Sequence, residues 1–206
     1  MSATSKISFD QTIRLRVVQI VVVLALLIIL LSYPAWPDDS VVAEMAELIG
    51  ITLLFTCILG RLWSILYSGG RKNADLVMEG PYSITRNPLY LFSILGAVGI
   101  GLMFISLVLA AILGGSAALV FYVTAQGEAT VLRSKFGETY DTYAHRVPFF
   151  WPNWTLYQEI QDATFNPKVL KRTFLDAMYF LAVLPLVEFI EWLRAGGMMP
   201  DLFAIY

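Results

Sequence analysis

The sequence predicts an all-α, polytopic membrane protein with about five transmembrane helices. Its 206 residues are 58% hydrophobic and only 15% charged, and the mean hydropathy is +0.69. A water-soluble domain of this size could not hide so much apolar surface. The apolar residues gather into long runs separated by polar stretches, and neither an internal repeat nor a low-complexity segment divides the chain. We therefore expect one membrane domain over residues 1–206.

The first two apolar runs predict spans at residues 17–33 and 46–67. Val, Leu, Ile and Ala fill the first run, and Tyr33 and Trp36 suit the membrane interface. No small-residue cleavage site follows this run, so we expect a retained signal anchor. Arg61 places a charge well inside the second run.

Three further spans are predicted at residues 89–103, 105–123 and 174–192. No polar loop separates the first two of these, which predicts a compact helical hairpin packed on small residues. The glycines that permit this packing are Gly96, Gly99, Gly101, Gly114 and Gly115. Pro185 is expected to kink the last span.

The basic residues predict the orientation of these spans. Twelve of them fall on one side of the membrane in this arrangement, namely Lys6, Arg14, Arg16, Arg71, Lys72, Arg86, Arg133, Lys135, Arg146, Lys168, Lys171 and Arg172. Arg194 falls on the other side. The positive-inside rule then places the N-terminus and residues 68–87 and 124–172 in the cytoplasm, at the inner membrane if the organism is bacterial.

The rest of the composition narrows the classes of function. A net charge of -2 offers no basic surface for nucleic acid. The single cysteine, Cys57, lies in an apolar run and excludes an intramolecular disulfide or a CxxC pair. His145 is the only histidine, so we expect no metal centre.

A polar stretch that reads EGPYSITRNPLYLF, residues 79–92, leads into the third span. Gly80 and Pro81 signal a turn. Pro88 disfavours helical backbone at Asn87 but suits the first turn of a helix. Asn87 is therefore expected at the N-cap position of the helix that follows.

Arg86 lies beside the N–H groups that begin this helix. Together they suit an anionic ligand group such as a carboxylate. Tyr82 and Tyr90 add aromatic faces nearby. One alternative stays open from the residues alone: Arg86 extends to the lipid headgroups, and both tyrosines belong to an interfacial aromatic belt.

A second polar stretch, QGEATVLRSKFGETYDTYAHRVPFFWP, follows the fourth span as residues 126–152. Glu128 comes just after that span, where an ionised group is costly to bury without a partner or a ligand. The residues expected to share its helical face are Leu132, Phe136 and Tyr143. Gly137 is expected to stop and restart the helix. The prolines beyond it leave an extended aromatic lip, residues 149–151.

The order of these motifs resembles that of the isoprenylcysteine carboxyl methyltransferase and phospholipid methyltransferase group of membrane enzymes. The motifs are GPYSITRNPLYL, then a hairpin, then a glutamate, and finally FGETYDTYAHRVPFFWP. The resemblance covers residues 79–154. It implies that S-adenosylmethionine is held between the two polar stretches and that a lipophilic acceptor arrives from the bilayer. Asn87 stands where the family often has His, and it cannot act as a base. Gly127 stands where some members have the first of two glutamates, which leaves Glu128 as the one carboxylate.

The resemblance also assigns site residues. The expected catalytic residues are Arg86, Glu128 and Arg146. The residues expected to bind the cofactor are Gly80, Pro81, Tyr82, Arg86, Asn87, Pro88, Tyr90, Leu91, Glu128, Tyr140, Tyr143, Val147 and Pro148. Among these, Arg86 or the helix N–H groups would meet the carboxylate of the donor, and Glu128 its ammonium or ribose hydroxyls. The tyrosines would flank the adenine or the sulfonium, and Arg146 would orient an acceptor carboxylate.

Other functions stay open at this point. NADPH-dependent sterol-type reductases carry similar motifs, although they are usually longer and this chain shows no extra basic cluster for a ribose phosphate. A phospholipid N-methyltransferase is a further candidate. A scaffold or a transporter half would instead show ionisable residues at mid-membrane or an inverted repeat. The expected partners are membrane lipids and the acceptor, for which a prenylated cysteine, an amine lipid, a quinone-type phenol and a small thiol all fit.

Overall fold

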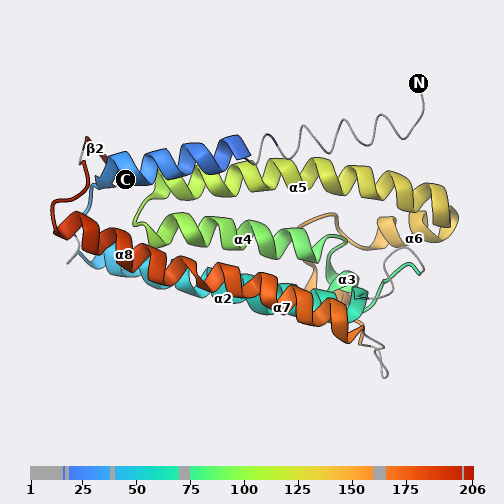
Figure 1. The fold of residues 1–206 in the computed structure, drawn as a ribbon. Helices are drawn as coiled ribbons and strands as arrows, with labels where there is room; N and C mark the ends of the chain where they lie inside the picture. The colour runs from blue at the N-terminus through green and yellow to red at the C-terminus, as the bar shows by residue number, and fades with distance from the viewer. Residues whose placement is uncertain (1–15, 17–18, 38–39, 70–74, 160–165, 201) are drawn as a thin grey trace.

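The computed structural model is an elongated bundle of helices that run along one long axis (Figure 1). It describes residues 16, 19–37, 40–69, 75–159, 166–200 and 202–206. The helices of this part are Gln19–Leu31, α2 (Val41–Ser68), α3 (Pro81–Ile84), α4 (Pro88–Met103), α5 (Leu107–Phe136), α6 (Glu138–Arg146), the short 3-10 helix η1 (Trp154–Leu156), α7 (Pro167–Leu181) and α8 (Val183–Ala195). The predicted helical fold is confirmed. We call the end that carries α3, α6 and η1 the loop end.

Helices α2, α4 and α5 form the core of the bundle. Helix α4 packs along α2 and turns back onto α5 within three residues. Ser106 caps α5, because its Oγ accepts a hydrogen bond of 3.1 Å from the N–H of Leu109. A side chain at Gly101 would overlap the backbone of Ala110, so glycine is needed where the two helices approach. This is the compact hairpin that the sequence predicts.

Helix α5 extends beyond the predicted membrane span. The sequence places the end of this span at residue 123 and a helix stop at Gly137, and the helix continues without a break to Phe136. The Ala, Gln, Glu, Leu, Arg and Lys residues after the apolar run are good helix formers and outnumber the weaker Thr, Ser, Val and Gly, so the helix continues beyond it. It ends at Gly137, which has a φ of 53°, and α6 starts at Glu138. The predicted stop is confirmed, and Glu128 lies on a regular helix.

The last apolar segment consists of two helices, α7 and α8. Helix α7 begins at Pro167, earlier than predicted, because Asn166 caps it through a side-chain hydrogen bond of 3.0 Å. The two helices meet at Ala182. Pro185 explains this break, since it donates no backbone hydrogen bond and its ring crowds the preceding turn. The predicted kink is confirmed.

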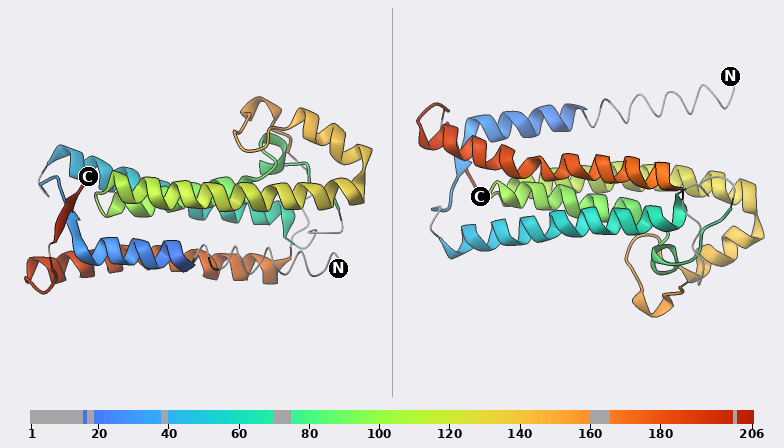
Figure 2. Two further views of the ribbon diagram at one scale, coloured as in Figure 1. Left: turned by 90° about the horizontal axis from the view of Figure 1, so that it is seen from above. Right: turned by 60° about the horizontal axis from the view of Figure 1, so that its bottom comes forward.

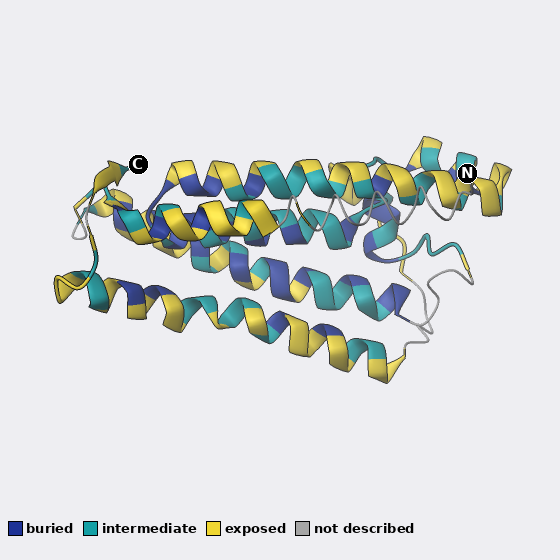
Figure 3. Cartoon of the chain, turned by 45° about the horizontal axis from the view of Figure 1, so that its top comes forward, coloured by how far each residue is buried: buried dark blue, intermediate teal, exposed yellow. Residues whose placement is uncertain are grey.

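Three stretches are long and apolar enough to cross a bilayer: Val41–Ser68, Leu107–Phe136 and Pro167–Ala195. Gln19–Leu31 and Pro88–Met103 are apolar but shorter. The 16 residues of α4 extend roughly 24 Å, against a hydrocarbon core of about 30 Å. Exposed residues lie on the outer faces of the helices (Figure 3), and many of them are large and apolar. The chain is therefore a multi-pass membrane protein, and the arrangement with five spans stays a prediction.

The orientation in the membrane also stays a prediction. Several of the residues that indicate it lie outside the described part of the chain, namely Lys6, Arg14, Arg71 and Lys72. So does residue 17, where the first span was predicted to start. The described basic residues at the start of α4 and α7 and at the ends of α5 and α6 all belong to the loop end.

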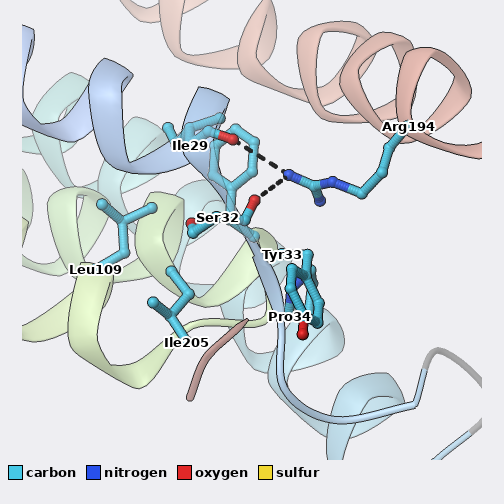
Figure 4. A pocket seen from close by; sticks show the side chains of 8 residues that line it. Ile29, Ser32, Tyr33, Pro34, Leu109, Arg194 and Ile205 are labelled. Carbon is cyan, nitrogen blue, oxygen red and sulfur yellow. Dashed lines mark hydrogen bonds between the residues drawn. The ribbon is translucent and has the colours of Figure 1, made fainter. Parts of the chain in front are cut away.

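The opposite end of the bundle is closed by a pair of short strands. Strand β1 (Ser32–Pro34) pairs in parallel with β2 (Phe203–Ile205). Arg194 of α8 donates to the carbonyl oxygens of Ile29, at 3.1 Å, and of Ser32, at 2.6 Å (Figure 4). A small hollow lies beside this arginine. The sequence predicted neither strand, and this end holds none of the predicted site residues.

Candidate functional site

At the loop end, the stretch before α4 lies against the stretch after α6 (Figure 2). Backbone hydrogen bonds join them from Arg86 N–H to Pro148 O (3.0 Å), from Asn153 N–H to Ile84 O (2.9 Å) and from Gly80 N–H to Gln158 O (2.7 Å). The structure thus brings together the two polar stretches that the sequence assigns to one site.

Gly80 makes the tight turn before α3 possible. Its φ of 56° and ψ of -129° form a combination that residues with a side chain rarely adopt. A Cβ at this position would lie 2.5 Å from the ring of Tyr67. Pro81 follows as the first residue of α3, where its fixed φ suits a helix start and its missing N–H costs nothing. The Gly-Pro pair is therefore required by the local geometry.

Gly80→Ala is expected to lower the free energy of unfolding by about 2 kcal/mol, because the strained backbone alone costs roughly 1–3 kcal/mol. The thermal unfolding midpoint in detergent measures this loss. Gly127→Ala is the matched control: Gly127 lies within α5, and an added Cβ meets nothing within 4 Å. This control should unfold at the wild-type temperature or slightly above it. Equal losses in both variants would contradict the explanation.

Asn87 occupies the predicted N-cap position, but its side chain does not cap α4. The side-chain amide donates instead to the carbonyl oxygen of Phe149, at 2.9 Å. Thr85 Oγ1 similarly donates to the carbonyl oxygen of Phe150, at 3.0 Å. These carbonyl groups need donors once the two stretches pack together. The first turn of α4 consequently keeps N–H groups without a side-chain cap.

Arg86 lies at the centre of this contact. Its guanidinium carbon is 4.9 Å from the centroid of the Phe149 ring, a cation–π arrangement. Its Nε is buried and has no hydrogen-bond partner among the described residues. A buried donor without a partner costs free energy, which an anionic group at this point would recover.

Glu128 faces the start of α4 from α5. Its Oε1 accepts a hydrogen bond of 2.8 Å from the hydroxyl of Tyr90. The Tyr90 ring in turn stacks on Phe121, with 4.9 Å between centroids and 17° between planes. The pKa of Tyr82 in α3 is raised mainly by burial, and the negative charge of Glu128 adds to this shift, so the two residues interact electrostatically. Both helices of the hairpin and α3 therefore meet near one carboxylate.

Two tyrosines, Tyr82 and Tyr143, lie inside the loop end. Burial raises the pKa of Tyr82 to about 12, although a hydrogen bond with Ser68 opposes the shift. Burial also raises the pKa of Tyr143, whose hydroxyl donates to the carbonyl oxygen of Tyr82 at 2.8 Å. Both phenols are therefore neutral at physiological pH, and Tyr143 acts as a hydrogen-bond donor.

The stability of the protein should fall as the pH rises from 10 to 12. Over this range the folded state keeps the Tyr82 proton, whereas the unfolded chain has released it. At pH 11 this difference in proton binding at Tyr82 lowers the free energy of unfolding by about 1 kcal/mol. In Tyr82→Phe, the difference between the free energies of unfolding at pH 8 and pH 11 should shrink by that amount. Denaturant unfolding in detergent measures it. Tyr179→Phe, exposed on α7, should keep the wild-type difference, and an unchanged difference in Tyr82→Phe would contradict the prediction.

A buried cluster holds α6 against α5. Its members include Tyr140, Tyr143, Val147, Leu132 and Phe136. Leu132 and Phe136 lie on α5, whereas Tyr143 lies on α6 beyond the break at Gly137, so these residues pack together across two helices and do not share one helical face as predicted. Tyr140 is 3% exposed and Val147 is 1% exposed. These two residues support α6, so their predicted contact with a cofactor would require an opening that the packing does not show.

The remaining predicted residues lie at the margins of the site. Pro88 is buried and Leu91 half-buried in the first turn of α4. Pro148 is half-buried and contributes its carbonyl oxygen to Arg86. Arg146 is exposed at the end of α6 and makes one long hydrogen bond, 3.5 Å, to the Gln158 side chain. Its role toward an acceptor stays a prediction.

Sequence reasoning missed the polar residues that join the two stretches. Ser83 Oγ donates to the carbonyl oxygen of Gly80 at 2.7 Å and accepts from the N–H of Gln158 at 3.0 Å. Thr85 makes a comparable bridge. The signal was present, because Ser83 and Thr85 both lie inside the recognised motif, where short hydroxyl side chains commonly bond to nearby backbone. The position of Gln158, by contrast, carried no signal.

Comparisons with known proteins place the chain among membrane methyltransferases. The family profile described as phospholipid methyltransferase matches residues 49–139, from α2 to the start of α6.

No group of three His, Cys, Asp or Glu side chains in the described part of the chain is placed to hold a metal ion.

Two relatives match nearly the whole chain. The nickel-cobalt-cadmium resistance protein NccN of Alcaligenes xylosoxydans xylosoxydans is 32% identical over 195 residues, which cover 94% of this chain and 90% of the relative. The cobalt-zinc-cadmium resistance protein CzcN of Cupriavidus metallidurans is 33% identical over 186 residues, which cover 90% and 85%. No solved structure matches the chain significantly. The chain thus belongs to one family with these relatives, and its residues 49–139 match the phospholipid methyltransferase profile, which belongs to the wider group of isoprenylcysteine carboxyl methyltransferase-like membrane methyltransferases.

Proposed function

We propose that this protein transfers a methyl group from S-adenosylmethionine to a lipophilic acceptor, in a reaction most like isoprenylcysteine carboxyl O-methylation. Family membership supports methyl transfer. The observation that supports binding of S-adenosylmethionine is the buried Nε of Arg86, which has no hydrogen-bond partner among the described residues. It lies beside the uncapped first turn of α4, so a carboxylate here meets a guanidinium and helix N–H groups together. The amino-acid part of the donor bears such a carboxylate.

The other residues of the site suit the remaining parts of the donor. Glu128 already accepts a hydrogen bond from Tyr90 and has further oxygen lone pairs for an ammonium or a ribose hydroxyl. The rings of Tyr82 and Tyr90 suit an adenine or a sulfonium. One cationic and one anionic side chain among aromatic rings therefore fit a zwitterion with an additional positive charge.

The chain itself needs to supply little acid–base chemistry. S-adenosylmethionine supplies an activated methyl group whose leaving thioether is neutral. Arg86 and Glu128 bind and orient, and Asn87 cannot titrate. Hydrogen bonds join residues 85–87 to residues 148–150 beside Arg86, and in this proposal the contact limits the access of water. Positioning and charge, rather than proton transfer, are the contributions of this chain.

The acceptor in this proposal comes from the bilayer, and the site lies on the cytoplasmic face. The relatives are named for resistance to nickel, cobalt, zinc and cadmium. We infer that a methylated membrane component connects this activity to metal tolerance. A deletion strain that lacks this gene should regain growth on cobalt or cadmium when it expresses the wild-type protein, but not when it expresses Arg86→Ala. Recovery with both would separate metal tolerance from methyl transfer.

Titration of the purified protein with S-adenosylmethionine and, separately, with NADPH tests the proposal and its main rival. We expect calorimetric binding of S-adenosylmethionine and none of NADPH. Methyl-labelled donor incubated with membranes and lipid extracts should then label a lipophilic product. Binding of NADPH alone would identify a sterol-type reductase instead. A labelled amine phospholipid would replace O-methylation with phospholipid N-methylation.

A further inference from the structure

Arg61 is a charged residue inside the bundle. It lies on α2, seven residues before the helix ends at Ser68, so it is roughly 10 Å below the loop end. Arginines near the end of a span usually extend their side chains to the interface. Arg61 instead lies between two other helices. Its Nη1 donates to Ser93 Oγ of α4 at 2.5 Å, and its guanidinium carbon is 5.8 Å from the centroid of the Phe180 ring of α7. Figure 1 shows α7 running along α2.

The charge of Arg61 is unmatched in the described part of the chain. No described carboxylate forms an ion pair with it, and its Nε is buried without a hydrogen-bond partner. Ser93 is a neutral acceptor, and its own hydroxyl proton is donated to the carbonyl oxygen of Leu89 at 2.7 Å. A guanidinium offers five N–H donors. One hydroxyl and one ring satisfy only part of this capacity, and a charge in an apolar bundle is costly without a counter-charge.

The surroundings of Arg61 connect it to the site. Ser93 lies one turn of α4 below Tyr90, the residue that donates to Glu128. Two residues beyond Arg61, Trp63 stacks on Trp154 of η1, with 6.4 Å between centroids and 3° between planes. A ligand held by Arg61 would therefore lie beneath the loop end, on the bilayer side of the site, without competing for Arg86.

We propose that Arg61 binds the anionic group, a carboxylate or a phosphate, of an amphipathic molecule that enters from the bilayer between α2, α4 and α7. Planar guanidinium groups match both anions through paired hydrogen bonds. This inference rests on the proposed function in one respect, that the molecule bound is the methyl acceptor. Arg61 is then a residue that determines acceptor specificity, and it is separate from the residues that bind the donor.

Two pairs of probes test the proposal by binding alone. One pair is N-acetyl-S-farnesylcysteine and its uncharged methyl ester, and the other is phosphatidic acid and diacylglycerol. Purified wild-type protein in neutral detergent should bind the anionic member of one pair at least about tenfold more tightly. Arg61→Met should abolish this preference, and Ser93→Ala should weaken it about twofold to fivefold. The pair that shows the preference identifies a carboxylate or a phosphate as the group bound.

Stability and donor binding distinguish a ligand site from a structural role. Because Arg61→Met removes an unmatched charge, its thermal unfolding midpoint should equal or exceed that of wild type, and its Kd for S-adenosylmethionine should be unchanged. A lower midpoint together with weaker donor binding would overturn the proposal, as would equal binding within both pairs by wild type. An anion preference that depends on Arg61, in a protein that fails to bind S-adenosylmethionine, would support the anion site and reject the proposed function.

Discussion

Arg86→Ala is expected to reduce methyl transfer at least about 100-fold, while folded protein remains in the membrane. The guanidinium provides the buried Nε donor and a delocalised charge over the Phe149 ring. Without it, a donor carboxylate retains only the N–H groups of α4. The Kd for S-adenosylmethionine should rise accordingly, as measured by calorimetry beside turnover of labelled donor. Arg86→Lys should recover only part of the activity, because an ammonium keeps the charge but loses the planar pair of donors.

Arg133→Ala is the control for this change of charge. Arg133 lies exposed on α5 and pairs with Asp141 at 2.6 Å, outside the contact between the two polar stretches. Its removal should leave turnover and donor affinity within about twofold of wild type, since exposed ion pairs contribute little. Wild-type turnover in Arg86→Ala would show that this cation does not bind the donor.

Glu128→Gln should have the second large effect, again a loss of roughly 100-fold or more in kcat/KM. Glutamine keeps the size of the side chain and still accepts a hydrogen bond from Tyr90, so the variant removes the negative charge and little else. Tyr90→Phe should cost roughly fivefold to tenfold, as expected for the loss of one hydrogen bond. Steady-state kinetics with labelled donor measure both variants.

Glu138→Gln makes the same chemical change at a solvent-exposed position in the first turn of α6. Its kcat/KM and its thermal unfolding midpoint should match those of wild type. If Glu128→Gln were as active as this control, the carboxylate would have no role in binding or orienting the donor, and the hydrogen bond to Tyr90 would be only structural.

The features that the sequence predicted correctly have local causes. Gly80 and Pro81 specify a turn through their own backbone preferences, and Gly137 ends α5 because it adopts a positive φ. Pro185 breaks the last apolar segment for an equally local reason. The meeting of two distant polar stretches was predicted on other grounds, because motif order resembles a known family and the basic residues share one side of the membrane.

The features that could not be predicted depend on distant contacts. The Asn87 side chain had several possible partners, and the choice follows from where the Phe149 carbonyl lies in the folded chain. Strands β1 and β2 have three residues each and are far apart in sequence, so they show no detectable period. Hydropathy alone did not show that α5 runs without a break past residue 123, because it marks where the lipid ends, whereas a helix can continue into water.

This uninterrupted α5 has a mechanical consequence. Its 30 residues extend about 45 Å, so the polar part beyond the apolar run projects roughly 20 Å past the lipid. When the apolar part tilts to match the thickness of the lipid, the projecting part moves with it as one rigid rod. Because Glu128 is part of that rod and Tyr90 belongs to its shorter neighbour, tilt alters the alignment of the carboxylate and the phenol. Acyl-chain length in reconstituted vesicles should therefore tune the rate of the enzyme.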